Sequence, residues 1–315
     1  MNKDKNRGDK SNIEPPKGGR GALGDKTNFS SPSGARGKFI EEKLIKLIMI
    51  LATLVVFAFV ASILYTILQR GLPSLTWDMI TKIPEGGYYN GGGGGILNAI
   101  IGSLYIVLGA TFLGLLISIP VVFYLNVYLS KTSRLAYIAR LAFDVMFGIP
   151  SIVYGAFAFS IMIYLGMRTS LGGGILVITL LVIPIFIRSM DEVAQHLPKD
   201  LLDATYALGA TKLEALKVVL RQIAPGIATA TLLSVGRAIG DAAGVMFTAG
   251  FTDSIPTSLS SPAATLPLSV FFQLSSPNAD VQDRAYAAAL ILTIIVLIIS
   301  IAGRLLGSYF SKNKI

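Results

Sequence analysis

Six long apolar stretches constrain this chain more than any other feature of its sequence. Crossing the hydrocarbon core of a bilayer takes a helix of about 20 apolar residues. Because lipid offers a backbone no hydrogen-bond partners, such stretches fold as helices. The fourth stretch is the shortest and contains Pro184, which we expect to kink it. We therefore predict an all-α integral membrane protein with six transmembrane helices, at residues 44–68, 99–125, 141–165, 174–188, 226–251 and 285–306.

The composition supports a membrane protein and excludes several kinds of site. Hydrophobic residues make up 53% of the chain and charged residues 14%, against about 25% charged residues in soluble domains. Disulfides, thiolate metal sites and cysteine nucleophiles are excluded because the chain has no cysteine. The single histidine, His196, lies in a polar stretch and is expected to be a solvated loop residue. We predict no metal site and no cofactor.

Residues 1–38 are predicted to form a disordered basic tail. They hold nine Lys or Arg against four acids, and almost no large apolar side chains. Such a segment cannot bury enough surface to fold, and it lacks the apolar core of a signal peptide. A basic segment beside a membrane span marks the cytoplasmic side, with an affinity for anionic lipid, more often than it binds RNA.

Positive charge in the short loops predicts the orientation of the spans. The external loops hold fewer basic residues and also several acids, whereas the cytoplasmic side of a membrane protein carries an excess of Lys and Arg. This rule places both termini in the cytoplasm of a multi-pass cell-membrane protein. The predicted cytoplasmic loops and tail hold Lys131, Arg134, Arg140, Arg188, Lys199, Lys212, Lys217, Arg221, Lys312 and Lys314.

The external segment 71–95 ends in five consecutive glycines, Gly91 to Gly95. Glycine permits almost any backbone geometry, so we predict a flexible connector there. No Gly-Lys-Ser/Thr ending follows these glycines or occurs elsewhere in the chain, which excludes a P-loop. ATP chemistry is therefore expected in another chain, and this one is predicted not to be an enzyme. Trp77, Tyr88 and Tyr89 are predicted to lie at the lipid headgroups.

A polar segment at about 191–222, between the fourth and fifth spans, carries helix signals of its own. Asp200 followed by Asp203 resembles a capping box, and Gly209 stands where a helix ends in a left-handed residue. Thr211 with Glu214 forms a second capping box and starts another helix. We therefore predict a helix–turn–helix bracket across the membrane surface, followed directly by a span. One face of its second helix carries the apolar residues Leu213, Leu216, Val219 and Leu220.

Two interpretations of this segment compete. Its periodicity alone favours an amphipathic linker that rests on lipid headgroups, and the alternative is a knob that inserts into a soluble partner. The spacing favours the knob: the triplet Asp203-Ala204-Thr205, Gly209 six residues after the acid, and Pro-Gly at 225–226 resemble the EAA loop of ABC-transporter type-1 permeases. In that family the loop docks a short helix in a groove of the ATP-binding subunit. The resemblance assigns Asp203, Ala204, Thr205 and Gly209 to ATPase coupling.

The chain departs from the family pattern at three places in this loop. Asp203 stands for glutamate and Thr205 for alanine, and both changes are mild. Arg221-Gln222 stands where the family often has Leu-Pro, with Pro225 three residues later. We therefore expect the second helix to run further before the chain turns into the membrane.

The resemblance extends over most of residues 95–308. Gly-Ile-Pro-Ser-Ile-Val at 148–153 and Arg-Ala-Ile-Gly-Asp-Ala-Ala at 237–243 are similar to segments of phosphate-transport permeases, and Thr-Leu-Pro-Leu at 265–268 matches the PstA-type better than the PstC-type subunit. It implies a permease domain at 96–308 after a first transmembrane helix at 39–70. It also implies three kinds of partner: a second homologous permease chain, a cytoplasmic ATP-binding subunit, present as a dimer, and an external phosphate-binding protein.

Arg237 lies near the middle of the fifth predicted span, where an arginine costs about 2.5–3.5 kcal/mol unless it is paired or faces water. Asp241 follows at i+4, on the same helical face. One interpretation is an ion pair that only fixes helix packing. The other is a guanidinium on the translocation path, since its planar donors match two phosphate oxygens. Ser151 either donates to a passing oxyanion or satisfies a carbonyl freed by Pro150, and Asp144 has a capping, pairing or path role.

The function that these observations predict is the permease subunit of an ATP-driven phosphate importer. The nearest alternative is the same fold carrying another oxyanion or an organic solute. A secondary transporter or channel predicts inverted repeats or a ring of pathway charges, and the sequence has neither. A membrane-anchoring scaffold leaves Arg237 and Asp241 unexplained.

Overall fold

The computed structural model describes residues 35–88, 91–129 and 133–312, so residues 1–34 of the tail predicted at 1–38 lie outside the described residues, as do Tyr89, Lys131 and Lys314. The last four residues of that predicted tail, 35–38, are helical. The chain consists of two units, residues 1–59 and 60–315. All regular elements of the described part are helices, and one isolated bridge joins Pro84 to Gly94. The prediction of an all-α fold is confirmed.

The first predicted span is the long helix α1, Ala35–Ser74, which begins before the predicted boundary at residue 39. Its part from Glu41 to Ser74 is apolar enough to cross a membrane. Apolar side chains such as Phe57 and Phe59 are exposed along it.

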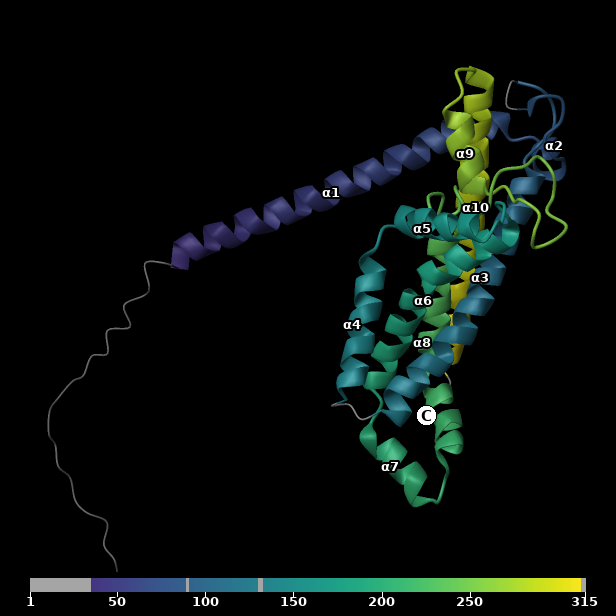
Figure 1. Ribbon diagram of the computed structural model, residues 1–315. Coiled ribbons are helices and arrows are strands. Elements are labelled where there is room, and N and C mark those ends of the chain that lie inside the picture. Colours follow the sequence, from purple (N-terminus) through teal and green to yellow (C-terminus); the bar gives the residue numbers. More distant parts are fainter. Residues whose placement is uncertain (1–34, 89–90, 130–132, 313–315) are drawn as a thin grey trace, which may run out of the picture. The chain divides into compact units, whose positions relative to one another are not determined.

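Among the described residues, five helices are long and apolar enough to span a bilayer, or six if the bent pair Arg134–Gly148 and Ser151–Tyr164 counts as one span. Four of the five lie in the second unit. They are α3 (Leu97–Phe123, continued by the π-helix η2, Tyr124–Tyr128), α6 (Leu171–Gln195), α8 (Lys212–Ile239) and α10 (Ala279–Lys312). Short helices α2 (Trp77–Thr81) and α9 (Leu266–Leu274) lie at the end of this unit opposite α7 (Lys199–Ala207), as Figure 1 shows.

The central helix is α6, which contacts α3, α4 (Arg134–Gly148), α5 (Ser151–Tyr164) and α8. The sequence prediction of a short span at 174–188 was wrong in its bounds, because the helix continues for seven residues beyond Arg188. At its start, the Ser170 hydroxyl caps the helix by accepting a hydrogen bond from Gly173 N at 3.2 Å. Pro184 lies inside the helix and does not end it.

Glycines in α3 allow neighbouring segments to approach closely. A Cβ at Gly114 would lie 2.8 Å from the Phe186 ring of α6, and a Cβ at Gly102 would lie 2.1 Å from the carbonyl oxygen of Ala264. The second contact is with backbone, which cannot rotate away, so Gly102 fixes how α3 meets the segment before α9.

Replacing Gly102 by alanine is expected to lower the free energy of unfolding by about 1–3 kcal/mol, the usual cost of overpacking. Thermal unfolding of the purified protein in detergent measures it. The matched control is Gly236→Ala in α8, where a Cβ meets open space, so the better helix propensity of alanine should leave stability equal or slightly raised. Equal midpoints for wild type and the Gly102 variant would contradict the packing.

The third predicted span, 141–165, is not one straight helix. It breaks between α4 and α5, whose axes are bent by 99°. Pro150 lacks a backbone N–H, and a residue before proline avoids the helical region. Ile149 accordingly adopts φ −73 and ψ 129. We call this break, residues 149–150, the elbow.

The polar segment and the fifth span differ from their predicted arrangement. The helix that starts at Lys212 continues through Pro225 as one 28-residue helix, so the second helix predicted for the polar segment and the helix of the fifth span are one element. It ends at Ile239 with Gly240 as its C-cap, well before the predicted end at 251. Asp241 begins the following turn, where its carboxylate accepts a hydrogen bond from Gly244 N at 2.7 Å. Asp side chains that bond nearby backbone in this way favour turns over helix.

The described residues of the glycine-rich segment 71–95 hold a defined set of backbone hydrogen bonds. Glu85 N donates to Gly93 O and Gly95 N to Ile83 O, both at 3.1 Å. The Arg284 guanidinium of α10 donates to the carbonyl oxygens of Tyr88 and Gly92 and stacks 4.8 Å from the Tyr88 ring centre.

Tyr88 is 2% exposed, which contradicts its predicted place at the headgroups. Its burial raises the pKa of its hydroxyl to about 12, against the smaller opposing effect of the Arg284 charge. The phenol is therefore neutral at physiological pH.

Candidate transport site and coupling surface

The bracket (residues 199–222) begins with α7 and turns at Gly209. Gly209 has φ +80, the left-handed conformation that glycine adopts without a Cβ penalty. Gly209 N donates to Tyr206 O at 2.9 Å and Ala210 N to Thr205 O at 3.3 Å. This pair of bonds is a Schellman motif, which satisfies the last carbonyls of a helix. The helix end predicted at Gly209 is confirmed.

The second helix of the bracket starts with the predicted capping box. Thr211 N donates to a Glu214 carboxylate oxygen at 2.7 Å, and Glu214 N donates to the Thr211 hydroxyl at 3.4 Å. The other predicted capping box was wrong, because α7 starts after Pro198 without a side-chain cap and Asp200 lies in its first turn. Proline at that position leaves the first amides to water and to the nearby carboxylate.

The bracket presents an exposed tip. Asp203, Ala204 and Gly209 are exposed, and Leu208 is 90% exposed. Thr205 is half-buried and donates its hydroxyl to Leu201 O at 2.7 Å.

The predicted apolar face of the second helix was partly wrong. Leu213 is 67% exposed and Leu220 is also exposed, whereas Ala215, Val219 and Ile223 are buried. The buried stripe is offset because the helix belongs to the bundle, where α6 and α10 contact it.

Arg237 lies in the last turn of α8 rather than at mid-helix, and it is exposed. Its guanidinium lies 5.7 Å from the Phe147 ring centre of α4, a cation–π contact. In the described part of the chain, ion pairs join Lys82 to Asp78, Arg140 to Asp191 and Arg188 to Asp144, and none includes Arg237. The predicted i+4 relation with Asp241 fails because the helix ends between the two residues.

The elbow lies beside Arg237. The Tyr154 hydroxyl of α5 donates to Met146 O of α4 at 2.7 Å and so ties the two arms of the elbow. Gly155 lies against the segment that follows α8, since a Cβ there would be 2.7 Å from Gly244 O. Ser151 is the first residue of α5 and half-buried. The structure therefore brings Arg237 and Ser151 to the same elbow.

Asp241 lines a separate cavity of about 10 Å³ with Ser103, Thr265 and apolar residues. The bracket is at the other end of α8, whose 28 residues span roughly 40 Å. The predicted path residue Arg237 and the predicted coupling residues thus lie at opposite ends of α8.

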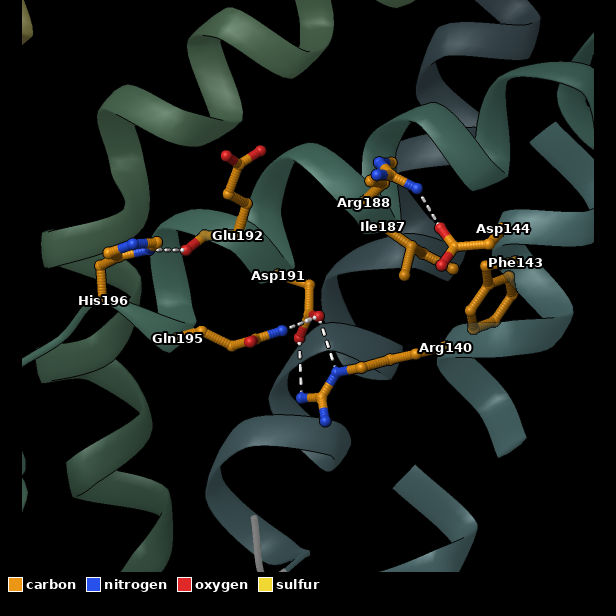
Figure 2. Close-up of a pocket in the computed structure, with 9 residues that line it drawn as sticks. All are labelled: Arg140, Phe143, Asp144, Ile187, Arg188, Asp191, Glu192, Gln195 and His196. Carbon is orange, nitrogen blue, oxygen red and sulfur yellow. Dashed lines mark hydrogen bonds and ion pairs between the residues drawn. The ribbon is translucent and has the colours of Figure 1, made fainter. Parts of the chain in front are cut away.

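A cluster of charged residues that sequence reasoning did not single out lies between α4 and α6 (Figure 2). Asp191 is 5% exposed and accepts hydrogen bonds from Arg140 Nε at 2.8 Å, Arg140 Nη2 at 3.1 Å and Asn126 Nδ2 at 2.6 Å. Gln195 Nε2 donates to it as well, at 2.5 Å. Asp191 therefore links η2, α4 and α6, and a cavity of about 250 Å³ opens beside it.

Asp144 pairs with Arg188 one turn away from this cluster (Figure 2), so of the roles left open for it the pairing is confirmed. The sequence offered a signal for the whole cluster: Arg188 and Asp191 lie three apart at the end of an apolar stretch. Only the charge of Arg188 was interpreted, as a marker of orientation.

Comparison with known proteins places this geometry in a family. The sequence profile described as "Binding-protein-dependent transport system inner membrane component" matches residues 110–314. A "Phosphate transport system permease protein PstA" from Haemophilus influenzae is 32% identical over 253 residues, 80% of this chain and 87% of that protein. A protein of the same name from Yersinia pestis is also 32% identical, over 80% of this chain and 84% of that protein.

A solved structure with a similar fold is titled "Inward facing conformations of the MetNI methionine ABC transporter". One of its chains superposes with a TM-score of 0.57 and 21% identity, over 68% of this chain and 95% of that one.

Proposed function

Since the chain belongs to the family of binding-protein-dependent transport system inner membrane components, we propose that it is the permease subunit of an ATP-driven importer of inorganic phosphate. It forms half of the translocation path, and a second homologous permease chain forms the other half. We assign 96–308 to the permease domain, after the first transmembrane helix at 39–70 and the external loop at 71–95.

The observation that carries the proposed cargo is Arg237. It is exposed at the elbow, and no carboxylate of the described residues forms an ion pair with it. An arginine at membrane depth persists where it faces water or a partner, and its guanidinium matches two phosphate oxygens at once. Phosphate transport is also what the names of the relatives state for those proteins. Ser151 and Asp241 complete the proposed path.

The bracket supports ATPase coupling. Its tip exposes the apolar side chains of Leu208, which follows α7, and of Leu213, in the first turn of α8, and a docked subunit would cover them. Asp203, Ala204, Thr205 and Gly209 lie in the same segment. We assign this surface to a cytoplasmic ATP-binding subunit, present as a dimer, which puts both termini in the cytoplasm.

The continuity of α8 supplies the mechanism. When the ATP-binding subunits close, they displace the bracket, and α8 carries that displacement to Arg237 at its far end. The elbow is the break at which α4 and α5 change their angle, so the path alternates between external and cytoplasmic access. The external binding protein delivers phosphate to the outward-facing state.

Uptake by cells tests this proposal. Deleting the gene should abolish high-affinity uptake of radiolabelled phosphate, and expression of the full chain should restore it. Excess unlabelled phosphate should compete, whereas sulfate and molybdate should not. Competition by one of these anions instead of phosphate would contradict the assigned cargo and indicate another oxyanion.

A further inference from the structure

Two ion pairs join helices α4 and α6, and each helix contributes one arginine and one aspartate to them. Arg140 and Asp144 lie four residues apart on α4, and Arg188 and Asp191 lie three apart on α6, so each pair shares a helix face. Arg140 pairs with Asp191 and Asp144 with Arg188. Since the pairing order is reversed along the chain, the two helices are antiparallel.

The two pairs differ in their surroundings. The Asp191 carboxylate is buried and receives donors from Arg140, Asn126 and Gln195. The other pair is half in solvent, with the side chains of Arg188 and Asp144 57% and 51% exposed. Figure 2 shows both pairs along the same cavity. The buried pair holds α4 against α6, and the exposed pair lies one turn further along both helices.

Alternation of sign makes only one register attractive. If α4 slides by one turn along its own direction, Arg140 comes to face Arg188. If it slides the other way, Asp144 comes to face Asp191. Both displacements replace opposite charges by like charges, which are strongly unfavourable partners at close range. Small sliding motions between packed helices are a common mode of conformational change, and this arrangement opposes them.

We propose that Arg140, Asp144, Arg188 and Asp191 are positioning residues for transport that lock the register of α4 against α6. The proposal rests on the proposed function. Only three residues separate the end of α6 from α7, so a displacement of the bracket moves α6 directly. With the register locked, α4 follows α6 as one body, and the motion is concentrated at the elbow and beside Arg237.

Cross-linking tests whether α4 and α6 slide during transport. This chain has no native cysteine, so Phe143→Cys with Ile187→Cys, at two positions that line the cavity, introduces the only two thiols of the chain. In the assembled transporter, joining them with a short thiol cross-linker should leave ATP-driven uptake within about twofold of wild type. Loss of uptake on cross-linking, with recovery after a reducible linker is cut, would overturn the lock. Each single-cysteine variant treated alike is the control.

Exchanging the exposed pair, Asp144→Arg with Arg188→Asp, tests the alternation itself. The native register keeps both attractions, but α4 now carries two positive and α6 two negative charges, so slid registers become attractive too. Uptake per ATP hydrolysed should fall by about tenfold, the scale of one pair interaction. The neutral variant Asp144→Asn with Arg188→Gln makes no slid register attractive. Its uptake per ATP hydrolysed should fall less than that of the exchanged variant.

The proposed register lock would be overturned if the exchanged variant takes up as much phosphate per ATP hydrolysed as wild type. It would also be overturned if the neutral variant loses as much of this uptake as the exchanged one. If the exchanged variant fails to reach the membrane, the cross-linking result decides alone. A wild-type chain that hydrolyses ATP with its partners but imports no phosphate would instead contradict the proposed function.

Discussion

Replacing Gly209 by valine is expected to reduce ATP-driven phosphate uptake to near background while leaving the chain folded in the membrane. Gly209 has φ +80, and a Cβ there meets nothing within 4 Å. The cost is therefore conformational, about 1–2 kcal/mol for a side chain in the left-handed region. The chain relieves it by changing the turn between α7 and α8. That turn sets the position of Leu208 and of all of α7, so the contact with the ATP-binding subunit is lost.

Gly166→Val is the matched control for this variant. Gly166 has φ +68 and also has open space around a Cβ, but it follows α5, away from the bracket. Both variants carry the same kind of backbone strain, but only Gly209 lies in the bracket, so only the Gly209 variant should lose uptake. The amount of each variant in the membrane, measured by immunoblot, should equal that of wild type. Normal uptake in the Gly209 variant would contradict the coupling role of the bracket.

Replacing Arg237 by glutamine is expected to lower phosphate uptake by roughly ten- to hundredfold, the range of one charge-assisted hydrogen-bonding group at about 1.5–3 kcal/mol. Thermal stability should change little, because the side chain is exposed, contacts the Phe147 ring and forms no ion pair with any of the described residues. Arg237→Lys, which keeps the charge but loses the planar fork, should give an intermediate rate. Initial rates of uptake at several phosphate concentrations compare wild type with the two variants, and thermal unfolding in detergent measures their stability.

Arg304→Gln, an exposed arginine of α10, controls for the loss of one positive charge and should take up phosphate normally. If the Arg237→Gln variant loses thermal stability along with uptake, Arg237 contributes to helix packing and not to the translocation path.

Local signals in the sequence were sufficient for part of this structure. Gly209 and the Thr211–Glu214 box marked the ends of helices correctly because a cap is made by residues three or four apart. The apolar stretches located the spans because the length of a span is set by the bilayer. Pro150 is a local signal for the elbow, but residues 141–165 were predicted as a single span because the whole stretch is apolar.

The features that were missed depend on contacts far apart in sequence. Asp191 accepts hydrogen bonds from Arg140, 51 residues away in the sequence, and from Asn126, 65 residues away. Arg284 donates a hydrogen bond to Gly92, which is 192 residues away. Since these distant partners cannot be identified from local sequence, a glycine-rich segment is predicted to be flexible and a single aspartate is predicted to be solvated in a loop. The end of α8 is a missed feature with a local cause, because Gly240 caps the helix and the Asp241 carboxylate accepts a hydrogen bond from Gly244 N. The apolar residues that continue to 251 led to the prediction of a longer span.

Reconstitution of the complete transporter tests the central claim most directly. This chain, its partner permease and the ATP-binding subunits are inserted into liposomes, with phosphate and the binding protein on the external face and ATP on the bracket face. We expect radiolabelled phosphate to accumulate against its gradient only when ATP and the binding protein are both present, and we expect no accumulation with the Gly209→Val variant. Phosphate that equilibrates without ATP, or accumulation unaffected by the Gly209 substitution, would contradict an ATP-driven phosphate permease coupled through the bracket.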